Sequence, residues 1–212
     1  MSDEELLKSL KKYGNDFIND FNTTLNKESD RGVILICAST IDCFFKDLIE
    51  KYLNKNKGRK KEISKLFEYP NPLNTFASKI QMSYCLGLIP KEMYEDFERV
   101  RKIRNVFAHG YDYKDFSTHE IATIVFDLVG AKRCWEYRSK EKAKSDTENK
   151  DSNEHKKRTE KVDVRKISKI VFITTVSYWL GLLASLIERR PDVFMDETTQ
   201  ELLINSLREK HE

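Results

Sequence analysis

The sequence predicts an all-α protein, a single helical-bundle domain with a flexible charged insertion. Helix breakers are rare, since the 212 residues include only 7 glycines and 4 prolines. Apolar residues recur at helical spacing along most of the chain. Hydrophobic residues make up 39% of the chain and charged residues 34%. This composition supplies a core inside a very polar surface.

Two helices are predicted in the first quarter of the chain. Residues 3–25 carry Leu and Phe at helical intervals. Residues 31–53 are apolar on most faces, as in a central helix of a bundle. Asp42 lies within this second segment, and a buried carboxylate requires a partner. Arg104 is one candidate for that partner.

Glycines and prolines delimit the next two helices. Pro72 suits the first turn of a helix that Gly87 stops. Pro90 starts a further helix that ends at Gly110, a natural left-handed cap.

Two later segments complete the bundle. A cap at Ser117 or Thr118 starts a helix that we expect to continue toward Tyr137. Residues 170–187 are uncharged and reach the short end of the length of a transmembrane helix. Their Ser, Thr and Gly content favours a core helix buried on all sides over a membrane span. The tail after Pro191 is predicted to form a short amphipathic helix.

A stretch of 25 residues, 139–163, differs in composition from the rest. It has mixed charge and almost no apolar residues, so it cannot bury enough surface to offset the entropy of ordering. We interpret it as a flexible insertion, with residues 1–138 and 164–212 forming one domain. A solvated extension of the flanking helices is the alternative.

The cysteines and the N-terminus indicate a cytoplasmic protein. Of the four cysteines, none forms a CxxC pair, and Cys37, Cys43 and Cys85 lie among apolar residues as small buried hydrophobes. A reducing compartment follows. The charged N-terminus has no apolar signal core. We expect no metal, no cofactor and no membrane association.

Much of the chain resembles the mannitol operon repressor (MtlR) family. The resemblance rests on "ASTIDCFFKDLIEKYL", on "NPLNTFASKIQMSYCLGLIPKEMYEDFERVRKIRNVFAH" and on "DFSTHEI". The family is all-helical and regulates transcription. No helix-turn-helix or zinc finger is visible in this chain.

A shorter stretch, "RNVFAH" from Arg104 to His109, resembles the Arg-x4-His motif of the HEPN superfamily. Many HEPN proteins are dimeric, metal-independent ribonucleases that act as toxins or in phage defence. The resemblance implies that His109 transfers a proton, that Arg104 binds the phosphate and that Asn105 orients it. The predicted site comprises catalytic Arg104, Asn105 and His109, substrate-binding Arg101, Lys60 and Lys61, and supporting Asp42.

Helical geometry limits this hypothesis. Arg104 and His109 are five residues apart, so on a regular helix they point about 140° apart. They converge only if the last turn distorts or if a partner subunit supplies one of them, which predicts a homodimer. The structural alternative is that His109 merely suits the negative end of a helix.

Two functions follow from these resemblances. The preferred prediction is a HEPN-type endoribonuclease with RNA as substrate and an antitoxin or a regulatory protein as the candidate partner. The alternative is a non-catalytic regulator of the mannitol-repressor type that acts through protein contacts.

Overall fold

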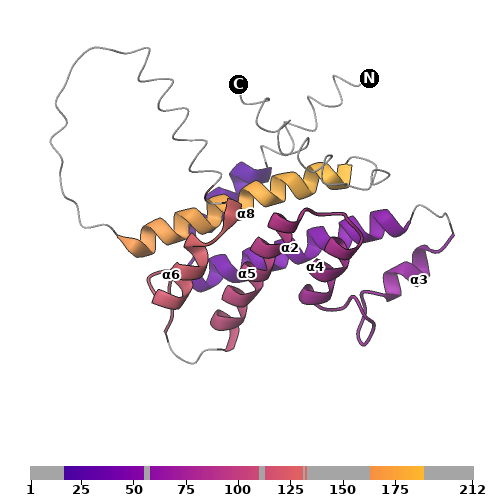
Figure 1. Cartoon of the computed structure of the whole chain (residues 1–212), viewed down its shortest axis with the longest axis horizontal. Coiled ribbons are helices and arrows are strands. Elements are labelled where there is room, and N and C mark those ends of the chain that lie inside the picture. Colours follow the sequence, from indigo (N-terminus) through magenta and orange to yellow (C-terminus); the bar gives the residue numbers. More distant parts are fainter. Residues whose placement is uncertain (1–16, 55–57, 110–112, 131, 133–162, 189–212) are drawn as a thin grey trace, which may run out of the picture.

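The computed structural model describes residues 17–54, 58–109, 113–130, 132 and 163–188 (Figure 1). Within these ranges every regular element is a helix and none is a strand, which confirms the all-α prediction. The named helices are α2 (Asp30–Leu53), α3 (Lys60–Lys65), α4 (Phe76–Cys85), α5 (Lys91–His109), α6 (His119–Phe126) and α8 (Val164–Glu188). Residues 17–27 form a further helical segment. The predicted insertion lies outside the described residues, except for Asp163.

The two longest helices, α2 and α8, lie side by side and run in the same direction. At their N-terminal ends Lys169 Nζ donates to the carbonyl of Glu28, just before α2, at 2.6 Å. At their C-terminal ends Lys51 Nζ donates to the carbonyl of Ile187. α4 and α5 pack on α2, and α6 packs along α8 (Figure 1).

The segment 17–27 runs back along this pair. The ring of Phe17 lies 5.8 Å from that of Phe44, halfway along α2. Ser177 of α8 donates a hydrogen bond to the Asn22 side chain at 2.6 Å. The segment therefore lies antiparallel to both long helices and covers one flank of α8.

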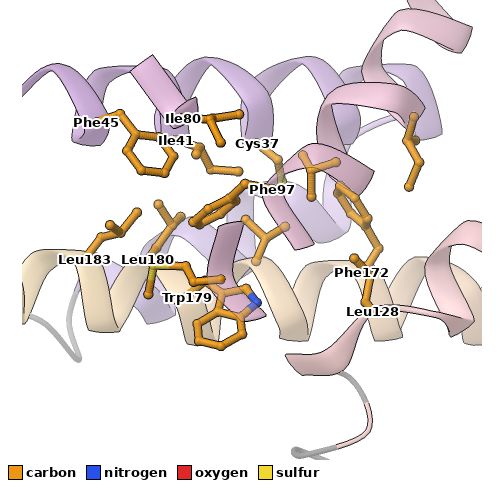
Figure 2. Close-up of a cluster of buried hydrophobic side chains, with 14 of the residues drawn as sticks. Cys37, Ile41, Phe45, Ile80, Phe97, Leu128, Phe172, Trp179, Leu180 and Leu183 are labelled. Atoms are coloured by element: carbon orange, nitrogen blue, oxygen red, sulfur yellow. The ribbon is translucent and has the colours of Figure 1, made fainter. Parts of the chain in front are cut away.

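The core lies between α2, α5 and α8 (Figure 2). Trp179 and Phe97 are fully buried, and the Phe97 ring packs edge-on against Phe45 at 5.1 Å. Phe116, from the turn before α6, packs on Phe172 of α8 at 5.5 Å. Aromatic pairs of this kind add directional contacts to the area that the core buries.

The start of α4 differs from the prediction. Pro72 precedes the helix rather than opening it, and Thr75 is the N-cap. The Thr75 hydroxyl accepts from the Ser78 amide, and the Ser78 hydroxyl accepts from the Thr75 amide. This reciprocal capping fixes the start of the helix. Gly87 follows α4 with φ of +66°, so its predicted role as a stop is confirmed.

The helix after Thr118 is shorter than predicted. α6 ends at Phe126, and helical geometry resumes at Val129. The amides of Val129 and Gly130 both donate to the carboxylate of Asp96, at 2.8 Å each. A carboxylate on a neighbouring helix thus caps a new helix start, which explains the break.

α8 begins earlier than predicted and is not buried on all sides. Among the described residues, Val164–Ile187 is the one helix long and apolar enough to cross a membrane, and an 18-residue window within it has a mean hydropathy of 2.0. Half of the residues in that window are buried within the protein. The inner face of α8 joins the core, while Ile167 and Ile170 remain exposed.

The cysteines also differ in part from expectation. Cys37 is fully buried, and burial raises the pKa of its thiol. Cys43 and Cys85 are exposed on α2 and α4, so their prediction as buried hydrophobes is wrong. Their apolar sequence neighbours point to the core from other faces of the same helices.

Candidate functional site

The C-terminal end of α5 carries the Arg-x4-His motif. Arg104 is exposed, and its Nη1 donates to the side-chain oxygen of the adjacent Asn105 at 3.2 Å. His109 forms the last residue of α5, and its side chain lies outside what the structure describes. Phe107 anchors this end of the helix through its ring contact with Phe116, 6.3 Å away.

Arg101, one turn before Asn105, is held by a neighbour on its own helix. Its Nη2 lies 2.7 Å from Glu98 Oε2, and its Nε donates to the same carboxylate at 3.1 Å. The hydrogen bond to Glu98 is the main cause of the raised pKa of this guanidinium. The fork that would hold a phosphate is therefore occupied by a carboxylate.

Asp42 pairs with Lys79 and not with Arg104, the partner considered from the sequence. Lys79 of α4 donates to both carboxylate oxygens of Asp42 at 2.7 Å. The lysine side chain is 6% exposed and that of Asp42 33%. Arg104 is not involved, so Asp42 joins α2 to α4 and does not contact the end of α5.

Lys60 and Lys61 lie far from this end of α5. Both are exposed on α3. This short helix follows the C-terminal end of α2 and contacts α2 there (Figure 1). The end of α5 lies near the opposite end of α2, since Phe116, which it contacts, donates its amide to Asp30. A helix of 24 residues is about 36 Å long, at 1.5 Å per residue. The fold therefore separates the two predicted parts of the site.

A buried carboxylate at Asp96 joins three segments of the chain. It is fully buried and accepts from the Trp179 indole Nε1 at 2.8 Å as well as from the Val129 and Gly130 amides. Arg99 completes the shell at 3.1 Å. Four donors satisfy the buried charge, so this group holds α5, α8 and the segment after α6 together.

A second acidic centre pins the start of α8. Asp30 is buried, accepts from Arg165 Nε at 2.8 Å and from the Phe116 amide, and lies 3.9 Å from Lys169 Nζ. The hydrogen bond to Asp30 raises the pKa of Arg165. Nearby, the Ser117 hydroxyl donates to Asp115 and lowers the pKa of that carboxyl.

Neither centre resembles a metal site. Across the part of the chain that the structure describes, no group of three or more His, Cys, Asp and Glu side chains is arranged to hold a metal ion.

A comparison with protein families identifies the relationship. A model of the mannitol repressor family matches residues 19–177, well over half of the 212-residue chain. The chain belongs to the mannitol repressor family. No curated protein matches it in sequence.

A solved structure shares the fold of this chain. The chain is similar to one in the X-ray structure of the MtlR–HPr complex from Escherichia coli, with a TM-score of 0.51 and 18% sequence identity. The match covers 82% of this chain and 97% of that chain. At this identity the likeness shows the shared fold.

The preferred functional prediction, a HEPN-type ribonuclease, is wrong. The match to the mannitol repressor family spans the Arg104–His109 motif and most of the fold around it, and it supports the alternative, a regulator of the mannitol-repressor type.

Sequence reasoning overlooked Asp96, although its position carried a signal. Asp96 lies three residues after Met93 and four before Val100, on the helix face that both share. A carboxylate on a core-facing stripe must be neutralised by donors from other elements. Asp30 gave a weaker signal, because an acidic residue in the first turn of a helix is common at exposed positions.

Proposed function

We propose that this chain is a non-catalytic transcriptional regulator of the mannitol-repressor type, which acts by binding other proteins. The family match over residues 19–177 carries the proposal. We further propose that one partner is an HPr protein. The support is that the structurally similar E. coli protein is in a complex with HPr.

The side-chain contacts favour a binding protein over an enzyme. Arg101 is paired with Glu98, and Lys79 is paired with Asp42. The carboxylate of Asp96 is saturated by four donors. Side chains held by fixed ion pairs and hydrogen bonds in this way stabilise the fold, whereas catalysis requires side chains that can exchange partners or protons.

We propose a cytoplasmic location for the same regulator. Cys43 and Cys85 are exposed and free of disulfides. Exposed thiols remain reduced in the cytoplasm, where disulfides are rare.

A binding experiment tests the partner. The full chain would be titrated calorimetrically with HPr from the same organism. We expect saturable one-to-one binding. An unrelated acidic protein of the same size is the control.

A genetic experiment tests the regulatory role. Deletion of the gene should raise expression from a reporter placed under the mannitol operon promoter of the same organism, and the wild-type gene should restore repression. An unchanged reporter would contradict the mannitol-specific role. Absence of binding to HPr would contradict the proposed partner.

A further inference from the structure

The first two turns of α8, residues 164–170, contribute little to the core, and we call them the α8 arm. Its three aliphatic side chains are 43%, 37% and 46% exposed, in the order Val164, Ile167 and Ile170. The buried cluster takes its first residue of α8 at Phe172, with Val171 half-buried against it. The hydrophobic effect, which stabilises the rest of the helix, therefore gives the α8 arm little hold on the bundle.

Charged side chains hold the α8 arm instead. Arg165 Nε donates to the Asp30 carboxylate at 2.8 Å and lies 3.7 Å from the carboxylate of Asp115. Lys169 Nζ lies 3.9 Å from the same Asp30 carboxylate and donates to the carbonyl of Glu28 at 2.6 Å. Both cations therefore bind at the start of α2, and the attachment of the arm depends on charge.

The anchor of these contacts belongs to the rest of the bundle. Asp30 lies in the first turn of α2, where the helix dipole favours a negative charge, and it also accepts from the Phe116 amide at 3.2 Å. The side chain of Arg165 is 47% exposed and that of Lys169 20%. When the arm leaves, water reaches both the cations and the carboxylate that they covered. Neither charge is then left buried, so separation costs far less than unfolding the core.

We propose that the α8 arm detaches from the bundle and closes again while the core stays folded, and that ionic strength sets the balance between the two states. Local opening of this kind occurs where few apolar contacts are buried. Salt weakens the attraction at Arg165 because exposed charges are screened over about 10 Å at 0.1 M ionic strength. The hinge lies at Val171, where contacts with the core begin.

Opening changes the charges that this end of the bundle presents. In the closed state Asp30 neutralises Arg165 and Lys169. In the open state the carboxylate and the two cations are separate and available to other molecules. A partner that binds one of the two states more tightly shifts the balance toward it. The arm thus gives the folded protein a conformational change that leaves its core intact.

Two thiols in one molecule separate opening of the arm from unfolding of the core. Ser168 is fully buried in the arm and its hydroxyl has no hydrogen-bond partner among the described residues, so Ser168→Cys should be tolerated. Cys37 is fully buried in the core and is the internal reference. The other cysteines of the sequence, Cys43, Cys85 and Cys134, are changed to serine. Labelling by iodoacetamide is followed by peptide mass spectrometry, and each rate is divided by the rate in the urea-unfolded chain.

We expect the introduced thiol to react at least about tenfold faster than Cys37 after this normalisation, because the arm opens more often than the core unfolds. Its rate should rise several-fold between about 50 and about 500 mM KCl, since salt screens the ion pairs of the arm. The rate of Cys37 should stay nearly constant over the same range.

Arg165→Gln tests whether the ion pair to Asp30 controls the opening. At low salt this variant should label the introduced thiol about tenfold faster, because a hydrogen bond between charged groups is lost, and it should lose most of the salt dependence. Lys166→Gln is the matched control. Lys166 is an exposed cation one residue further along and forms no ion pair among the described residues, so its removal should leave the rate and its salt dependence unchanged.

Three results would overturn the proposal. Equal normalised rates for the two thiols would show that the arm opens only when the core unfolds. Fast labelling that depends neither on salt nor on Arg165 would show that the helix end frays without control by the ion pair. Slow labelling that persists in Arg165→Gln would show that another part of the chain holds the arm. If Ser168→Cys fails to fold, hydrogen exchange of residues 164–171 in the wild-type and Arg165→Gln chains gives the same comparison. None of these results depends on HPr binding.

Discussion

At the scale of single residues, the ion pair between Asp42 and Lys79 is asymmetric in its surroundings. The lysine side chain is 6% exposed, whereas that of the aspartate is 33% exposed. A charge that loses its partner costs little where water can replace the partner and much where it cannot. Removal of the Asp42 carboxylate should therefore lower the stability of the protein more than removal of the Lys79 ammonium.

We expect Asp42→Asn to destabilise the protein more than Lys79→Met. The asparagine change leaves a buried ammonium without its carboxylate and should cost about 2–4 kcal/mol. The methionine change leaves Asp42 able to hydrate and should cost below about 1 kcal/mol. Urea unfolding of both variants and of the double variant measures the difference. Equal losses would show that the lysine is hydrated in the folded protein.

Asp96 should be the most sensitive carboxylate among the described residues. Asp96→Asn replaces one of two acceptor oxygens with an NH2 donor group. Each oxygen accepts two bonds, so the new donors face either the Trp179 indole and the Gly130 amide or Arg99 and the Val129 amide. We expect a loss of about 3 kcal/mol, from at least one unsatisfied buried donor and a weaker acceptor. The urea midpoint should fall at constant slope. Asp47→Asn, at an exposed position on α2, should leave it unchanged.

At the scale of helices, the sequence predicted most elements and misplaced their ends. Apolar spacing identified α2, α5 and α8 because that spacing records which face meets the core. Local signals were weaker. Pro72 suits a first turn, yet the reciprocal bonds of Thr75 and Ser78 start α4 three residues later. The end of α6 depends on Asp96, more than 30 residues away, so no local pattern could show it.

The candidate site was predicted less well than the fold, because its contacts also join residues that are far apart in the sequence. Arg104 and Asn105 are neighbours in sequence, and the structure keeps them in contact. The partner of Asp42, in contrast, comes from a helix 37 residues further along the chain. Only the packing of α4 on α2 decides that contact, and a single sequence does not contain it.

Two glycines test how closely the helices approach. A Cβ on Gly130 would lie 2.8 Å from Thr175 and 2.9 Å from the Trp179 indole. Gly130→Ala should therefore push the segment after α6 away from α8 and cost about 1–3 kcal/mol. Gly181→Ala adds a methyl group in open space within a helix and should stabilise by up to about 1 kcal/mol. Thermal unfolding should move the two variants in opposite directions.

At the scale of the whole molecule, the order of helices along the chain makes folding depend on both ends of the described region. α8, from residue 164 onward, supplies Phe172, Trp179 and Leu183 to a core whose other wall is α2. The two helices run parallel, so the chain must cross the length of the bundle between them. The core that α2, α5 and α8 share is incomplete until α8 joins it.

The last prediction concerns cooperativity. Because α8 completes the core and Asp96 ties it to α5, we expect far-ultraviolet circular dichroism and Trp179 fluorescence to report one coincident unfolding transition. The measurement uses a Trp135→Phe variant, so that the buried indole is the only fluorophore of its kind. A variant that ends at residue 163 should show the opposite: low helicity, no cooperative transition and exposed apolar surface. If the fluorescence transition of the full chain instead precedes loss of helicity, α8 detaches from a folded remainder, and the shared core is not what holds α2, α4 and α5 together.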